Sequence, residues 1–396
     1  MRNQRTIPAT ASYAVIHSAT WGFYAVLLVY SSNFLYNYGF ADGQISLFLG
    51  LATLASCVLQ LVCAELIARL KRLQTFHVLL AMALLMVAGS AMMLSGSLLP
   101  AVAGLWLDSV LLQAIPAMTN AIGMDAIAHG SPIRYGVSRG IGSGGYSLLA
   151  LLTGQLVQRL GTGAVAAVAL GTSVAFVAGA LWFRRAGDVP VNETAVKQES
   201  SGRGGFVKSY PLFSCFLLGA ILLYTSHNLI TSFMMQVIVS KGGNAANQGV
   251  ATFLAALTEI PVMFAFAWLL RKASCRFWLY LSALFFLVKA MGLYLAGSMA
   301  AVYAVQATQF LGYALFSIAA VYYAESTVGG EDTVRAQSYL SSTTAIGGLI
   351  ASFSGGYLCQ LLGAPGMLLV SSAFAIAGIT VVVLSIRAQR KELISP

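Results

Sequence analysis

Long apolar runs, separated by short polar or glycine- and proline-containing stretches, extend along almost the whole chain. A helix needs about 20 mainly apolar residues to cross a bilayer, and the pattern predicts twelve such spans. They cover residues 12–38, 43–68, 75–96, 99–128, 138–159 and 163–183, and then 210–240, 246–270, 277–297, 299–325, 337–361 and 364–386. The pattern therefore predicts an all-α membrane protein with twelve transmembrane helices.

One long polar stretch, residues 184–209, separates the first six predicted helices from the last six, and it is rich in glycine, serine and charge. This composition is typical of a flexible connection. We therefore expect an N-terminal six-helix bundle over 1–183, a cytoplasmic linker over 184–209 and a C-terminal six-helix bundle over 210–396.

A short internal repeat favours two related halves. The sequence GQLVQRLG at 154–161 resembles GYLCQLLG at 356–363, and the same offset of 202 positions places Gly145 on Gly347. Duplicated six-helix bundles are pseudo-symmetric, and their functional site is expected at their interface near the bilayer midplane.

Composition and charge agree with this interpretation. The 396 residues are 58% hydrophobic and 9% charged, whereas soluble domains carry about 25% charged residues. With both termini placed in the cytoplasm, 18 of the 22 Lys and Arg residues fall in cytoplasmic segments, Arg159 and Lys241 fall outside, and Arg139 and Lys289 lie within spans. The net charge of +10 is thus the positive-inside signal of a multi-pass protein of the cell inner membrane, and it gives no reason to expect a nucleic-acid partner.

Two charged residues lie deep inside neighbouring predicted spans. Glu259 is 12 residues before Arg271, and Lys289 is 13 residues after Arg276. A charge near the bilayer centre costs about 2.5–3.5 kcal/mol or more, so the two residues either form a buried pair that only fixes packing or belong to a site or gate. Because a buried pair is weak evidence for stability, the sequence favours a coupling role, and Pro261 loosens the helix beside Glu259.

Several polar and aromatic residues share helix faces. His17, Trp21 and Tyr24 follow one face of the first span, and Tyr224, His227 and Thr231 follow one face of the seventh. Aromatic faces beside polar tips suit sugar rings, nucleobases or aromatic acids, and histidine can carry a proton near physiological pH. The alternative for each histidine is a satisfied hydrogen bond between helices.

The tenth span carries a similar stripe, and the fourth and fifth spans carry isolated charges. Tyr303, Gln306, Gln309 and Tyr313 form a polar and aromatic stripe that either lines a binding site or joins helices. Asp125 and Arg139 are either substrate contacts or interfacial charges, and Asp108 lies deeper in its span than Asp125.

No residue set for catalysis or metal binding stands out. The five cysteines have no metal-ligand spacing, the four histidines are scattered, and the glycines at 140–145 lack the Lys-Ser/Thr of a phosphate loop. We expect no enzyme, no cofactor and no bound metal. A soluble receptor domain is not visible either.

One segment resembles a known family. Residues 133–156, IRYGVSRGIGSGGYSLLALLTGQL, are similar to the junction between the fourth and fifth helices in major facilitator superfamily proteins of the lactose permease type and in their phenylpropionate and nucleoside permease relatives. The resemblance implies the major facilitator fold. It also implies that Arg139, Tyr146 and Asp125 bind substrate, and that Glu259 and Lys289 couple binding to proton movement.

The chain also departs from that family. Where the permease has Lys-x-x-His-x-x-Glu in its tenth helix, this chain has Gln306, Gln309 and Gly312, and the cytoplasmic signature after the second helix is reduced to AELIARLKR at 64–72. Proton coupling must then use other groups, and galactoside specificity is not implied.

These patterns together predict a monomeric secondary transporter that moves a small polar or aromatic organic solute by proton-coupled symport. Proton-coupled efflux of sugars or drugs is the alternative, and a membrane receptor or membrane enzyme is the alternative from another class. The predicted substrate contacts are Arg139, Asp125, Tyr146, Trp21, Tyr24, Gln306, Gln309 and His227, and the predicted coupling residues are Glu259, Lys289 and His17.

Overall fold

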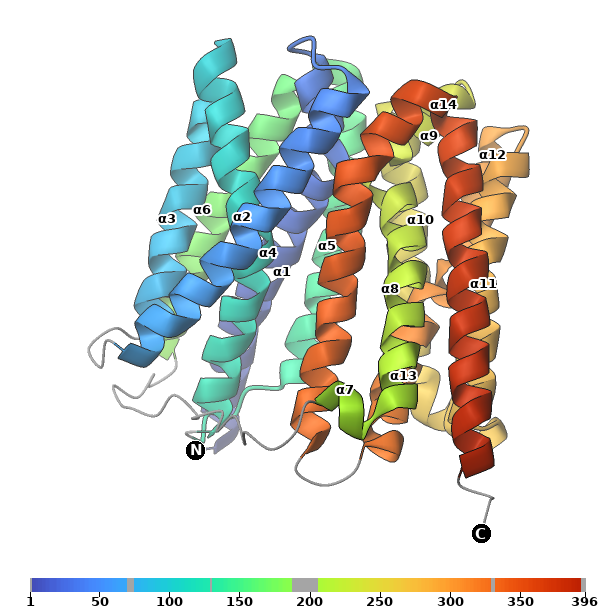
Figure 1. The fold of residues 1–396 in the computed structure, drawn as a ribbon. Helices are drawn as coiled ribbons and strands as arrows, with labels where there is room; N and C mark the ends of the chain where they lie inside the picture. Colours follow the sequence, from blue (N-terminus) through green and yellow to red (C-terminus); the bar gives the residue numbers. More distant parts are fainter. Residues whose placement is uncertain (1, 70–74, 129, 187–205, 329–331, 393–396) are drawn as a thin grey trace. The chain divides into compact units, whose positions relative to one another are not determined.

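The computed structural model describes residues 2–69, 75–128, 130–186, 206–328 and 332–392, and every regular element in them is a helix. Most of the predicted linker 184–209 lies outside these residues. Figure 1 shows α1 (Arg2–Tyr36), α2 (Asp42–Arg69), α3 (Thr75–Met93), α4 (Leu98–Ala128), α5 (Tyr135–Leu160), α6 (Gly163–Ala186), α7 (Phe206–Ser209), α8 (Pro211–Ser232), α9 (Met234–Ser240), α10 (Ala245–Lys272), α11 (Cys275–Leu295), α12 (Met299–Ala307), α13 (Tyr313–Thr327) and α14 (Thr333–Glu392).

The predicted membrane helices are confirmed. Within the described residues nine helices are long and apolar enough to cross a bilayer, and α4, bent by 42°, is a tenth. The helix α5 has membrane length but a low hydropathy because glycines and Arg139 interrupt it. The helix α14 contains two spans, since its backbone turns at Gly363, and the described residues thus hold the twelve-helix plan of the fold.

Two spans are less regular than their apolar pattern predicts. The predicted span 210–240 is divided into α8 and α9 at Phe233. The predicted span 299–325 is divided into α12, a 3₁₀ turn at Thr308–Phe310 and α13. Apolar length alone does not report such breaks, because the residues around them are as apolar as those of a continuous helix.

The chain forms two compact units. Unit 1 comprises residues 1–41, 51–199 and 244–253, and unit 2 comprises 42–50, 200–243 and 254–396. In unit 1, the Gln248 amide at the start of α10 donates to the Val29 carbonyl over 2.6 Å. The domain boundaries predicted at 183 and 210 stay a prediction.

Each unit has a central helix with two close neighbours. In unit 1, α1 packs against α5 and α6, and Gly145 brings α5 so close that an added Cβ would lie 3.1 Å from the Ser18 Cα. In unit 2, α8 packs against both limbs of α14, and a Cβ on Gly347 would lie 2.8 Å from the backbone nitrogen of Thr225. The pair Gly145 and Gly347, related by the 202-residue offset, therefore has the same packing role in both units.

The ends of the repeated segments also match in conformation. Gly161 ends α5 with φ 81° and ψ 179°, and Gly363 turns α14 with φ 68° and ψ 172°. This region of backbone space is essentially accessible only to glycine. The two glycines are 202 positions apart, so the internal repeat of the sequence extends to a repeated turn.

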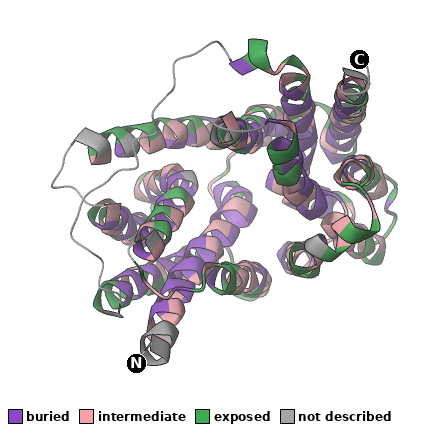
Figure 2. Cartoon of the chain, turned by 90° about the horizontal axis from the view of Figure 1, so that it is seen from below, coloured by how far each residue is buried: buried purple, intermediate pink, exposed green. Residues whose placement is uncertain are grey.

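Exposed apolar side chains cover the outer sides of the helices. Figure 2 shows buried residues where helices face one another and exposed residues on their opposite sides. Large examples are Leu61, Leu160 and Leu361, which are 73%, 73% and 77% exposed. In a chain with membrane-length helices, such surfaces are the ones that lipid tails cover.

Candidate functional site

Three polar side chains are linked inside unit 2. Glu259 is the fifteenth residue of the 28-residue α10, and Lys289 is the fifteenth of the 21 residues of α11. Gln309 lies between them in the 3₁₀ turn. Its Nε2 donates to Glu259 Oε1 over 2.6 Å, and its Oε1 accepts a hydrogen bond from Lys289 Nζ.

The arrangement refines the predicted pair of opposite charges. No ion pair within 4 Å joins Glu259 and Lys289, although both side chains belong to the described residues. The amide of Gln309 connects them instead. Its orientation follows from the charges, since the carboxylate can only accept and the ammonium can only donate. Lys289 is only 5% exposed, and burying this charge is tolerable because it is hydrogen-bonded.

A break in the helix places Gln309 at this point. The helix α12 ends at Ala307, and Gly312 has φ −88° and ψ −93°, which no α-helix contains. The chain then restarts as α13 at Tyr313. Irregular backbone within a span leaves polar groups that need partners, and it is found where protein or water surrounds it.

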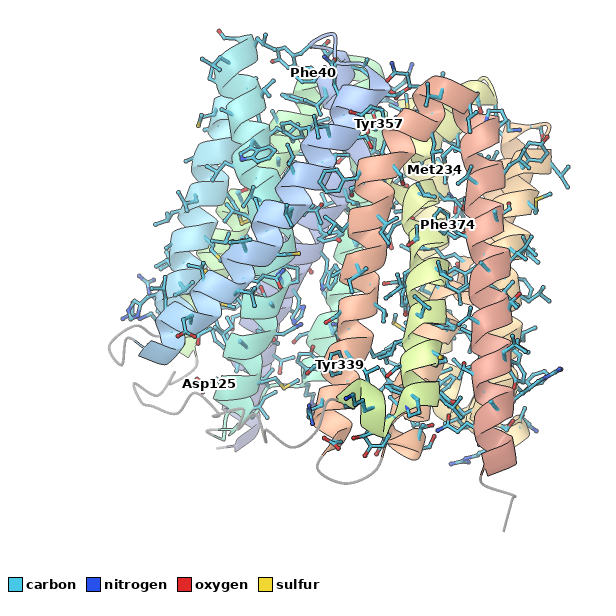
Figure 3. All side chains as sticks on the ribbon, viewed as in Figure 1. Phe40, Asp125, Met234, Tyr339, Tyr357 and Phe374 are labelled. Atoms are coloured by element: carbon cyan, nitrogen blue, oxygen red, sulfur yellow. The ribbon has the colours of Figure 1, made fainter. Side chains whose placement is uncertain are left out.

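The break also changes the predicted stripe of the tenth span. Gln306 is 2% exposed, and its Nε2 lies 3.4 Å from the sulfur of Met234 (labelled in Figure 3). Gln309 instead contacts Glu259 and Lys289. A single continuous face through Gln306, Gln309 and Tyr313 is therefore wrong, because it assumed an unbroken helix. Substrate binding by Gln306 and Gln309 stays a prediction.

His227 of α8 belongs to an aromatic cluster. Its ring stacks on Tyr313, with centroids 4.4 Å apart and planes inclined by 13°, and the edge of Phe286 approaches it at 6.2 Å. Thr231 Oγ1 lies 3.4 Å from His227 Nε2. Tyr313 is the first residue of α13. The break between α12 and α13 therefore places both Gln309, which contacts Glu259 and Lys289, and Tyr313, which stacks on His227.

His17 lies in a second aromatic cluster, inside unit 1. It is 1% exposed, and it contacts Tyr13 and Tyr135 edge to face, with centroid distances of 4.7 and 5.8 Å. Neither ring nitrogen has a hydrogen-bond partner among the described residues. Tyr13 donates to the Thr119 carbonyl over 3.0 Å, so this cluster joins α1, α4 and α5.

The two tyrosines around His17 were not predicted from the sequence. Tyr13 precedes His17 by four residues, and it therefore extends the face that His17, Trp21 and Tyr24 define. That spacing was a usable signal. Tyr135 comes from a different helix, and its phenol donates to Asn120 Oδ1 over 3.1 Å; nothing in the local sequence indicates this pairing.

Arg139 of α5 lies beside the aromatic face of α1. The guanidinium carbon lies 5.7 Å from the centre of the Trp21 ring, and Trp21 lies 5.6 Å from Tyr24. Arg139 is exposed. A cation over an indole face gains about 0.5–1 kcal/mol at an exposed site, so Trp21 orients the guanidinium while leaving its donors accessible.

The other predicted contacts of unit 1 are half-buried. Asp125 lies near the end of α4, as labelled in Figure 3, and Tyr146 lies two turns after Arg139 on α5. Both residues have interactions with their surroundings. Their roles in substrate binding stay predictions.

Known proteins place this arrangement in a family. The model of the MFS_1-like family matches residues 13–367, whereas no curated protein sequence matches the chain. The crystal structure of the nucleoside transporter NupG aligns with a TM-score of 0.76 at 11% identity, covering 97% of this chain and 99% of that one. An auto-inhibited peptide transporter of the POT family aligns with a TM-score of 0.73 at 12% identity, covering 96% of each chain. At these identities the structures establish the fold, and the family match over most of the sequence shows that the chain belongs to the MFS_1-like family of the major facilitator superfamily.

Proposed function

We propose that the protein is a proton-coupled symporter that carries a small polar or aromatic organic solute across the cell inner membrane by alternating access. The observation that carries the proposal is the connection from the half-buried Glu259 through the half-buried Gln309 to the buried Lys289. Charged groups at such depth are costly, and in membrane proteins they mark ion and substrate pathways. Transport of a solute by a member of this family fits both the fold and the absence of a sizeable soluble domain in the described residues.

The hydrogen bonds of Gln309 with Glu259 and Lys289 indicate what protonation of Glu259 would change. Ionised Glu259 accepts strongly from Gln309 and offsets the charge of Lys289. When Glu259 takes up a proton, its bond from Gln309 becomes a weaker neutral one, and the Lys289 ammonium loses its counter-charge. A solute that carries a carboxylate or another strong acceptor can replace that counter-charge. Binding of the proton and of the solute then favour each other, and this reciprocal coupling is what symport requires.

Residues of unit 1 supply further candidate contacts for the solute. Arg139 offers a planar set of donors, Trp21 and Tyr24 offer aromatic faces, and Asp125 and Tyr146 add an acceptor and a further ring. Such a set suits a ring-bearing solute with hydroxyl or carboxyl groups. The solved structures that resemble this chain are described as nucleoside and peptide transporters, and both solute classes carry such groups.

The experiment that tests this function begins with the solute. Purified protein is screened for thermal stabilisation by nucleosides, short peptides, sugars and aromatic acids. Solutes that stabilise it are then assayed for uptake into proteoliposomes with an imposed inward proton gradient. Gradient-driven accumulation of a stabilising solute supports the proposal, whereas uptake that stops at equilibrium contradicts the coupling.

We expect Arg139→Lys to weaken solute binding by about tenfold or more, which corresponds to about 1.4 kcal/mol. Lysine keeps the charge but loses the planar donor fork and stacks less well on Trp21. Thermal stabilisation by increasing solute concentrations measures the change. Arg159→Lys, near the other end of the same helix and also exposed, is the matched control and should bind like the wild type. Equal affinity in both variants would assign Arg139 to topology alone.

The orientation belongs to the same proposal. Both termini and the segment 184–209 are placed in the cytoplasm, because this orientation puts the excess of Lys and Arg on the inner side. A proton gradient directed into the cell would then drive uptake.

A further inference from the structure

A buried carboxyl group lies in unit 1. Asp108 is the eleventh of the 31 residues of α4, and its side chain is 0% exposed. Its Oδ2 lies within hydrogen-bond distance of Ser90 Oγ of α3, at 2.7 Å. Its Oδ1 is buried and has no hydrogen-bond partner in the described residues. A fully buried carboxylate with one hydrogen bond and no cation is highly unfavourable.

No charge that could balance an ionised Asp108 contacts it among the described residues. The helix α4 packs against α3 and α1, and α6 joins the cluster through the contact of Ser173 with Ser90. Their described ionisable side chains are Tyr13, His17, Tyr24, Tyr30, Tyr36, His77, Arg184 and Arg185. None of them has an ion pair or hydrogen bond with Asp108, whose side-chain hydrogen bonds in the described part of the chain are limited to the one with Ser90. His77 and Ser90 are 13 residues apart on α3, or about 20 Å at 1.5 Å per residue.

The backbones of α3 and α4 lie close together beside the carboxyl group. A Cβ added to Gly89 would overlap Oδ1 of Asp108, and one added to Gly104 would lie 2.8 Å from the Met92 Cβ. The two glycines let α3 and α4 approach so closely that the carboxyl oxygen rests against the backbone of α3. A sodium ion would need several oxygen ligands around it, whereas a proton needs only one acceptor.

The hydrogen bonds in the cluster leave one proton unaccounted for. Ser90 Oγ lies 3.3 Å from Ser173 Oγ of α6, and Ser173 donates to the Ala169 carbonyl over 2.7 Å. Each serine has one hydroxyl hydrogen. If Asp108 is ionised, Ser90 must donate to it and Ser173 is committed to Ala169, so no hydrogen remains for the contact between the two serines.

A protonated carboxyl group supplies the missing hydrogen. Its O–H donates to Ser90, Ser90 then donates to Ser173, and Ser173 donates to Ala169. This order makes three hydrogen bonds in place of two, and it leaves no buried charge. It also connects α4, α3 and α6 in one continuous chain.

We propose that Asp108, with Ser90 and Ser173, is a proton-binding site inside unit 1, occupied in this conformation and separate from the Glu259 site. The bound proton holds α3, α4 and α6 together. Proton binding at Asp108 depends neither on the identity of the solute nor on whether transport is coupled through Glu259.

Infrared spectroscopy of the purified protein tests the site, because the C=O stretch of a protonated carboxyl group is separate from the bands of carboxylates. At neutral pH the wild type should show this band, and Asp108→Asn should lose it. The band should persist in Glu259→Gln, which controls for the half-buried acid of unit 2. Ser90→Ala should shift the band, since it removes the group that Asp108 donates to.

Folding is controlled within the same experiment. The amide introduced by Asp108→Asn can donate to Ser90 as the protonated acid does, so this variant should unfold within a few degrees of the wild type. If that variant does not fold, the shift in Ser90→Ala decides the matter, and an unshifted band overturns the proposal. Identical spectra for folded Asp108→Asn and the wild type also overturn it. Stabilisation of the wild type by sodium that Asp108→Asn abolishes would replace the proton with a metal ion.

Discussion

Glu259→Gln is expected to abolish accumulation of the solute while leaving exchange across the membrane intact. Glutamine retains the size of Glu259 and an acceptor for the Gln309 amide, but it cannot bind or release the proton. A one-unit pH difference can drive about tenfold accumulation through a one-proton symporter, because each 1.4 kcal/mol changes a concentration ratio tenfold. In the variant the ratio of inner to outer solute should fall to one. Uptake and counterflow in the same proteoliposomes measure both quantities.

The control is Glu325→Gln, which makes the same change at an exposed carboxyl group of α13 in the same unit. It should accumulate solute like the wild type. If Glu259→Gln also accumulated solute to the wild-type level under the imposed gradient, Glu259 would not be the coupling group.

The second large effect is expected at Gln309. Gln309→Leu removes both hydrogen bonds that connect Glu259 and Lys289, and it leaves the half-buried carboxylate and the buried ammonium without these partners. Hydrogen bonds to charged groups contribute about 1.5–3 kcal/mol each, so the variant should lose thermal stability as well as accumulation. Thermal unfolding and gradient-driven uptake give the two readouts.

Gln309→His tests whether the two hydrogen bonds matter or whether any side chain that fills this position is sufficient. An imidazole can accept at one nitrogen and donate from the other, and it should therefore retain more stability and more accumulation than leucine. Gln337→Leu, whose amide donates to the Val321 carbonyl of α13, is the matched control. Equal behaviour of Gln309→Leu and Gln309→His would show that the hydrogen bonds to Glu259 and Lys289 do not matter.

The positions of the membrane spans along the chain could be predicted because they depend on the pattern of apolar and polar residues within each span. Apolar length identified the twelve spans, and the repeat between 154–161 and 356–363 anticipated the common turn at Gly161 and Gly363. The break of the tenth span was not predicted. Gly312 is visible in the sequence, but a glycine is tolerated in many helices, and the contacts of Gln309 with other helices favour the interrupted form.

The site could be predicted only in part, because contacts between helices are not visible in the sequence of any one helix. Depth within a span identified Glu259 and Lys289 as unusual, and adjacency in the chain suggested that they lie close together. The bridging amide depends on the register between α10, α11 and the turn after α12, which no single span records. Asp108 was likewise recognisable by its depth, whereas its partners Ser90 and Ser173 come from two other helices.

Movement of protons with the solute tests the central claim most directly. Proteoliposomes are loaded with a pH-sensitive dye, no pH gradient is imposed, and an inward gradient of a solute identified by stabilisation is applied. The account predicts that the lumen of wild-type proteoliposomes becomes acidic as solute enters, and that Glu259→Gln proteoliposomes take up solute without this change. Solute entry without acidification in the wild type would contradict proton symport.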